Sequence, residues 1–358
     1  MYIYFLLIIF WAFLYIILKG FGIKYKLKKW NLWYAGMAAV ALSLVMGLRH
    51  YSVGIDIAGY LNVYNSINPY LSLNLFNYDE WGYQIFIVIL RNLGFGSQGY
   101  IIVTSIIIST SFALLFYRYS KNIFLSLFLH LSIGLFSMSM SGVRQTLAVC
   151  LILLAFHFII KGNFIRYLIT VFLASTLHNS ALVFLPIYFL RNLKINKKMG
   201  IVLLLVTSSS LLYRKLLIPI IEFFMPIRYA DIELISTFTV NPLLIGIALA
   251  IPTTCLLFWG SIEGMEKQER SLFSIFFVLS CLNAFVTILS LNSVMIGRLA
   301  FYFVTFNLVL IPNIIATIKD KKLRTIAIYL CVILPLIQFS IAIPDGVMRI
   351  DQYKFFWQ

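Results

Sequence analysis

Apolar runs of about 20 residues recur from one end of the chain to the other, and a helix of that length crosses a ~30 Å hydrocarbon layer. Of the 358 residues, 62% are hydrophobic and 11% are charged, against roughly 25% charged residues in a typical soluble domain. The pattern predicts an all-α polytopic membrane protein with about twelve transmembrane helices. It leaves no stretch that reads as a soluble domain.

We expect one integral membrane domain over residues 1–358, because no linker, low-complexity tract or convincing repeat interrupts the chain. The first apolar run, 2–18, lacks a basic leader and a small-residue cleavage site, which indicates a retained helix. The cysteines have no paired spacing and lie in apolar segments, as buried small hydrophobes do. We therefore predict no metal site and no cofactor. The cysteines are Cys150, Cys255, Cys281 and Cys331.

The net charge of +16 is concentrated in particular loops, and placing these loops in the cytoplasm satisfies the positive-inside rule. The charge then indicates topology and attraction to anionic lipid, and no nucleic-acid partner is predicted. This assignment requires 82–93 to be a short re-entrant or interfacial helix on the outer side. It also requires 164–190 to fold back near His178. The basic loops are 19–29, 118–121, 161–166, 191–198, 267–270 and 319–324.

Arg144 is the only Asp, Glu, Lys or Arg between Ile123 and Ile160. A guanidinium near hydrocarbon costs about 2.5–3.5 kcal/mol, and charged residues kept there usually serve an ion, a substrate or a buried partner. Small residues precede Arg144 and a helix is expected to begin nearby. A helix N-terminus with an arginine fork suits a phosphate or pyrophosphate. The alternative is an arginine that snorkels at a span boundary.

Two further motifs hold candidate proton acceptors. His178 interrupts an apolar run and is either a general base or a hydrogen-bonded packing residue. Arg49 ends the second predicted span and Asp56 follows it. These two residues either pair, or Arg49 holds an anion while Asp56 accepts a proton, or Arg49 caps the helix C-terminus.

Glu80 stands among aromatic residues, as carboxylates do in sugar-binding sites, although such aromatics also form interfacial belts. The carboxylates of this segment are otherwise explained as the start of the next helix. Arg298 is a lone basic residue at another outward span entry. We hypothesise that Arg49, Arg144 and Arg298 converge on one anionic ligand.

The motifs together resemble the EpsG-like family of Wzy-type polysaccharide polymerases, over most of the chain. The sequence departs from the family at Ile55, where a hydroxyl residue is frequent. The motifs are Gly47-Leu48-Arg49, Val53-Gly54-Ile55-Asp56 with Tyr60, Glu80-Trp81-Gly82-Tyr83, Ser141-Gly142-Val143-Arg144-Gln145 and His178-Asn179-Ser180-Ala181.

The resemblance implies a GT-C-like fold in the bacterial cytoplasmic (inner) membrane, with a periplasmic or extracellular active face. It implies a glycosyltransferase that joins oligosaccharide repeat units linked to undecaprenyl pyrophosphate and releases undecaprenyl pyrophosphate. A chain-length regulator protein is implied as a further partner, beside the lipid-linked oligosaccharide and the membrane lipid.

In that reaction, negative charge develops on the pyrophosphate, and fixed arginines stabilise it without a metal. We expect Arg144 and Arg298 on the pyrophosphate, with Arg49 either joining them or positioning Asp56. His178 is the first choice for the catalytic base and Asp56 the second. The expected substrate-binding residues are Gln145, Tyr60, Glu80, Trp81, Tyr83 and Ser180.

Three other functions use similar residues. A flippase of lipid-linked oligosaccharide is a transporter that also needs a cationic cavity, but it favours a two-fold repeat, which is not evident. A membrane O-acyltransferase would need polar residues toward the inner face, where this chain has mainly lysines. An O-antigen ligase is closely related in chemistry and stays open as an alternative.

Overall fold

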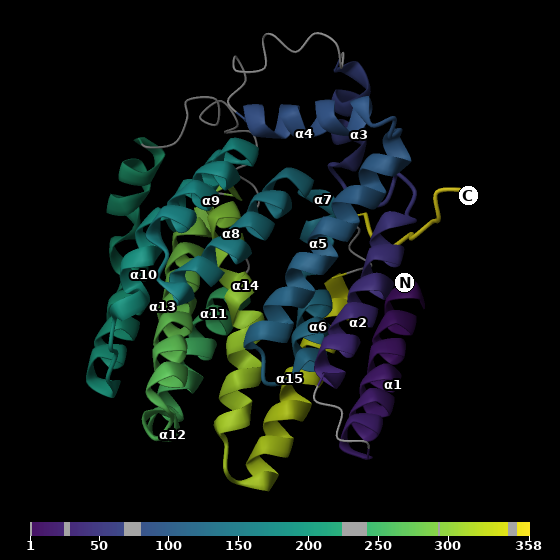
Figure 1. Ribbon diagram of the computed structural model, residues 1–358. Coiled ribbons are helices and arrows are strands. Elements are labelled where there is room, and N and C mark those ends of the chain that lie inside the picture. The colour runs from purple at the N-terminus through teal and green to yellow at the C-terminus, as the bar shows by residue number, and fades with distance from the viewer. Residues whose placement is uncertain (1, 25–28, 68–79, 224–241, 293, 343–348) are drawn as a thin grey trace. The chain divides into compact units, whose positions relative to one another are not determined.

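The computed structural model describes residues 2–24, 29–67, 80–223, 242–292, 294–342 and 349–358, and these form helices joined by short connections (Figure 1). The only strand-like pairing in these ranges is an isolated bridge between Arg49 and Phe355. The α-helices are α1 (Tyr2–Lys24), α2 (Trp30–Gly47), α3 (Ile57–Ser66), α4 (Trp81–Asn92), α5 (Ser97–Tyr119), α6 (Ile123–Ser132), α7 (Leu135–Ser141), α8 (Val143–Lys161), α9 (Phe164–Leu177), α10 (Lys197–Phe223), α11 (Pro242–Leu257), α12 (Trp259–Glu263), α13 (Lys267–Leu289), α14 (Val294–Thr317) and α15 (Lys321–Ala342), and the 3₁₀ helices are η2 (Asn179–Asn192) and η4 (Ser290–Asn292).

Within the described ranges, eight helices are long and apolar enough to cross a membrane. Helices α6 and α7, which are bent by 61° at a short break, form either a broken ninth span or a re-entrant loop. Gly134 lies at this break with a φ of 87°, a conformation that glycine adopts without strain. The protein is thus a polytopic α-helical membrane protein. The expected count of about twelve spans is not confirmed, because the remaining apolar helices, such as Phe164–Leu177, are shorter.

The helices group into two compact units by their contacts. The first unit holds Met1–Leu185 and Thr325–Gln358, and the second holds Pro186–Arg324. The single-domain assignment of residues 1–358 stays a prediction. All the side-chain contacts described below lie within the first unit.

The short helix expected at 82–93 is present as α4, which has 12 residues. At 1.5 Å per residue it is about 18 Å long, too short to cross the ~30 Å hydrocarbon layer. It runs across the end of the long helices of its unit and not alongside them (Figure 1).

The chain also reverses at His178, as the charge pattern predicts. Helix α9 ends there, with φ −158° and ψ 114° at His178, and η2 follows. The Tyr167 hydroxyl, near the start of α9, donates a hydrogen bond to the carbonyl of Phe184 in η2. This contact requires η2 to return along α9, so the segment makes two short passes and not one long helix.

The segment after α2 is tied to the C-terminal tail. The His50 amide donates to the Lys354 carbonyl, and the Phe356 amide donates to the Leu48 carbonyl. The Tyr4 hydroxyl in α1 donates to the Ile350 carbonyl at 3.0 Å. The start of α1 and the tail therefore lie together at one end of the first unit.

Candidate active site

Glu80, the residue before α4, connects two of the predicted site residues. Its Oε1 atom accepts a hydrogen bond from Nδ1 of His178, and its Oε2 atom accepts one from Nη1 of Arg144, both at 2.5 Å. The backbone N–H of Asn179 also donates to the carboxylate. The side chains of Glu80 and His178 are each 10% exposed. One buried carboxylate thus holds a histidine and an arginine from two other helical segments.

The charge of Glu80 determines how His178 is oriented. Burial by itself raises the pKa of the Glu80 carboxyl, but the hydrogen bond and electrostatic interaction with His178 and the charge of Arg144 outweigh burial, so the pKa is lowered. The ionised carboxylate can only accept hydrogen bonds, so Nδ1 of His178 carries a proton. In the neutral ring Nε2 then carries the lone pair. Glu80 therefore selects the tautomer in which Nε2 is the basic atom.

Arg144 is the second residue of α8, directly after Gly142 and Val143. Its guanidinium carbon lies 5.4 Å from the ring centre of Tyr60 and 5.6 Å from that of Tyr83. Its side chain is 39% exposed, while its Nε atom is buried and has no hydrogen-bond partner among the described residues. Unsatisfied buried donors are rare and call for an explanation such as a catalytic role. Arg144 is thus held by Glu80 but still has surface for an anion.

Close approach of two helices builds this arrangement. A Cβ atom on Gly82 would lie 2.1 Å from Oγ1 of Thr176, so only glycine lets α4 reach the end of α9. The Tyr83 and Tyr100 hydroxyls share a hydrogen bond of 2.7 Å, which fixes α4 against α5. Because Glu80 precedes α4 and His178 follows α9, these contacts bring the carboxylate to the imidazole.

Several expected residues therefore lie together: Glu80, His178, Arg144, Tyr60 and Tyr83. The rings of Tyr60 and Tyr83 pack edge to face, with 6.1 Å between their centres. The other expected substrate-binding residues are their neighbours in the chain, with Gln145 buried and Trp81 and Ser180 half-buried.

Arg49 is placed differently. Arg49 is 1% exposed, and its guanidinium donates to the carbonyls of Val53 at 3.2 Å, Met46 at 2.5 Å and Met140 at 3.0 Å. These bonds use the donors that a pyrophosphate or a partner carboxylate would need. Burial lowers the pKa of Arg49 to about 10, so it stays charged at neutral pH. We therefore do not retain Arg49 as a pyrophosphate ligand or as the partner of Asp56.

The two remaining candidates are Asp56 and Arg298. Asp56 is the exposed N-cap residue of α3, and its side chain makes no capping hydrogen bond. Arg298 is exposed on α14 in the second unit. Its role on the pyrophosphate stays a prediction.

Residues 32–355, nearly the whole chain, match the sequence model of the EpsG family. The chain belongs to the EpsG family. This is a family of Wzy-like polymerases, which supports a polymerase or glycosyltransferase role in general. No curated protein and no solved structure matched the chain.

In this EpsG-family chain, sequence reasoning missed the residues that support the site. It assigned Glu80 to sugar binding and not to the orientation of His178, 98 positions away. It also missed Thr176 and Tyr100, which receive α4. The Gly82 motif was the one signal that two backbones meet there, because glycine permits close approach.

Proposed function

We propose that this protein is a membrane glycosyltransferase that polymerises oligosaccharide repeat units carried on undecaprenyl pyrophosphate. The observation that carries the proposal is the Glu80 carboxylate, which accepts from His178 and Arg144 at once. His178, the proposed base, and Arg144, the proposed anion ligand, both contact this carboxylate, which supports the proposal. Family membership supports the general reaction class.

His178 is the proposed catalytic base. The acceptor sugar hydroxyl attacks the anomeric carbon of the donor, and its proton passes to Nε2 of His178. Glu80 accepts from Nδ1, so it orients the ring and stabilises the imidazolium that forms, as the carboxylate does in hydrolase triads. Asp56, the second choice from the sequence, is exposed and lies outside this cluster, so we favour His178.

Arg144 is the proposed ligand of the leaving group. As the anomeric C–O bond breaks, negative charge grows on the pyrophosphate oxygen. A guanidinium already fixed by Glu80 stabilises that charge without moving. The part of Arg144 that remains exposed is available for this contact, and undecaprenyl pyrophosphate then leaves.

The aromatic residues around Arg144 supply a surface for sugars. Tyr60 and Tyr83 already contact the guanidinium through their ring faces. Trp81 is half-buried directly beside Glu80. We propose that Tyr60, Trp81 and Ser180 bind the repeat unit on the outer side of the cytoplasmic membrane. Tyr83 and Gln145 are 1% and 3% exposed, so they shape the site beneath the sugar.

The test is the surface polysaccharide of a strain that lacks the gene, complemented with wild type or with Arg144→Ala. Wild type should restore a ladder of chain lengths, while Arg144→Ala at equal membrane abundance should give only the single repeat unit. A full ladder with Arg144→Ala would contradict the role of Arg144.

The deletion strain itself separates the other functions. A polymerase defect leaves the single repeat unit at the surface. Loss of even that unit would point to a flippase or a ligase, and an unchanged ladder would point to decoration of the polymer by an acyltransferase.

A further inference from the structure

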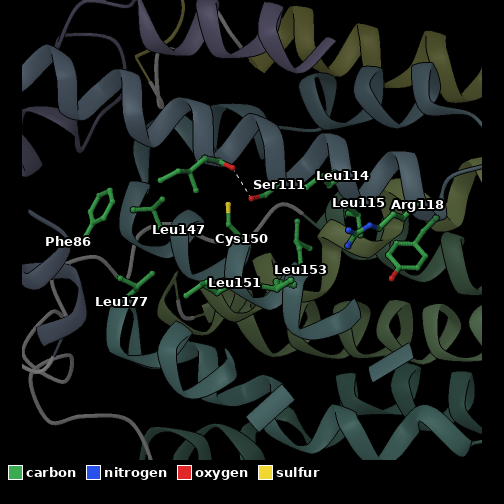
Figure 2. Close-up of a pocket in the computed structure, with 13 residues that line it drawn as sticks. Phe86, Ser111, Leu114, Leu115, Arg118, Leu147, Cys150, Leu151, Leu153 and Leu177 are labelled. Atoms are coloured by element: carbon green, nitrogen blue, oxygen red, sulfur yellow. Dashed lines mark hydrogen bonds between the residues drawn. The ribbon is translucent and has the colours of Figure 1, made fainter. Parts of the chain in front are cut away.

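A groove with apolar walls lies between α5 and α8 (Figure 2). Its volume is about 330 Å³, within the range of roughly 300–1,000 Å³ that is usual for ligand sites. Arg118 lies at one end of the groove, and Phe86 and Leu177 lie at the other (Figure 2). Between these ends the walls are mostly leucine side chains, with Ile107, Ser111 and Cys150 among them. The groove is therefore amphipathic along its length.

The groove is about as long as one leaflet is thick. Its lining on α5 extends from Ile107 to Tyr119, which is about 18 Å at 1.5 Å per residue. Half of the hydrocarbon core is about 15 Å. Leu114 and Leu154, from the two walls, are 41% and 43% exposed. Helices α5 and α8 are long and apolar enough to cross a membrane, so this exposed side would face hydrocarbon, where a lipid chain can enter.

The Arg118 end is polar and cationic. Arg118 is exposed, and no carboxylate forms a salt bridge with it in the part of the chain that the structure describes. Tyr119 shares a hydrogen bond of 3.0 Å with His157 of α8. Lys161, one turn further along α8, ends that helix with a second positive charge. An anionic headgroup would thus find two cations and two polar rings at this end.

We propose that the groove binds an anionic glycerophospholipid, with its headgroup at Arg118 and one acyl chain between α5 and α8. The positive charges at the Arg118 end favour an anionic headgroup, and an apolar wall as long as one leaflet favours an acyl chain. The Phe86 end of the groove approaches the Glu80 cluster, because Leu177 directly precedes His178 and Leu147 lies one turn after Arg144. A bound lipid would therefore pack beneath the candidate active site. The proposal does not depend on the polymerase function.

The experiment uses the purified full chain and a phosphatidylglycerol with a photoreactive group on one acyl chain. After irradiation, the labelled peptides are identified by mass spectrometry. Label should appear in peptides covering 107–119 and 147–154. Unlabelled phosphatidylglycerol should compete for the site, while phosphatidylcholine with the same chains should not.

Two variants separate headgroup from tail. Arg118→Ala should reduce labelling about tenfold, the order expected for loss of a charge-assisted contact. Arg166→Ala removes an exposed arginine from the neighbouring basic loop and should label like wild type. Leu154→Trp leaves every charge in place but obstructs the groove, so it should also reduce labelling.

Four results would overturn the proposal. Equal competition by phosphatidylcholine, or wild-type labelling of Arg118→Ala, would show that the anionic headgroup is not recognised. Unchanged labelling of Leu154→Trp would show that the acyl chain does not lie in the groove. Competition by a polyprenyl phosphate but not by phosphatidylglycerol would assign the groove to the tail of the lipid-linked substrate.

Discussion

Glu80→Gln is the change that most directly probes the candidate active site. Glutamine keeps the size of the side chain but is neutral, and one of its two terminal atoms is a donor. That NH₂ group must face either Nη1 of Arg144 or Nδ1 of His178, both of which donate to Glu80 in the structure. In the first orientation two N–H donors face each other, that of the glutamine amide and that of Arg144. In the second, Nδ1 of His178 must accept a hydrogen bond, which reverses the tautomer of the ring.

The size of the effect follows from these two bonds. A hydrogen bond to a charged group contributes about 1.5–3 kcal/mol, so the two together contribute about 3–6 kcal/mol. Arg144 is 39% exposed and solvent screens its share, so we use the lower end. A loss of about 3 kcal/mol in the transition state corresponds to a rate about 100-fold lower.

The assay is the initial rate of polymer formation from lipid-linked repeat units by the protein in proteoliposomes. Glu263→Gln is the matched control, because Glu263 is an exposed carboxylate on α12 and should leave the rate unchanged. If Glu80→Gln polymerises at more than about a tenth of the wild-type rate at equal abundance, Glu80 does not orient the catalytic base.

Three other predictions concern the same region. Gly82→Ala forces a methyl group against Thr176, which costs about 1–3 kcal/mol and should lower both melting temperature and activity, whereas Gly59→Ala meets nothing within 4 Å and should not. Arg144→Lys keeps the positive charge but loses the two-pronged geometry of the guanidinium, so we expect a polymerisation rate about tenfold lower. The wild type should keep full activity in EDTA, because the arginine supplies the positive charge. Since the pKa of Glu80 is lowered, its stabilisation is complete above the unfolded pKa of about 4.3 and is lost as the pH falls through the folded value. The difference in melting temperature between wild type and Glu80→Gln should be independent of pH from about pH 7 to about pH 5. It should shrink as the pH falls below about 4.

The sequence predicted the helical membrane architecture because apolar runs and basic loops are local signals. Those signals also predicted α4 and the reversal at His178, since a one-sided placement of the basic loops requires both. The number of spans was less accessible. Helices such as Phe164–Leu177 and Leu243–Leu257 are apolar but shorter than a span, so length alone does not decide whether they cross.

The candidate site was predicted as a set of residues and not as a set of contacts. Arg49 and Arg144 look alike in the sequence, since each lies at a span boundary, two residues after a glycine. They differ in their partners: backbone carbonyls such as that of Met140 receive Arg49, and a carboxylate receives Arg144. Any residue type supplies a carbonyl, so the sequence cannot show which arginine is already occupied.

The hydrogen bond between Tyr4 and Ile350 limits how many times the chain can cross the membrane. Because the two residues are in contact, they lie at the same level of the membrane. The chain between them therefore crosses an even number of times. The eight long helices satisfy this parity, but counting the broken α6–α7 span gives nine. In that case an odd number of the shorter helical segments must cross as well. The return of η2 along α9 does not change the parity, because two opposite passes cancel. Among the helices that the structure describes, α11 would then complete an even count.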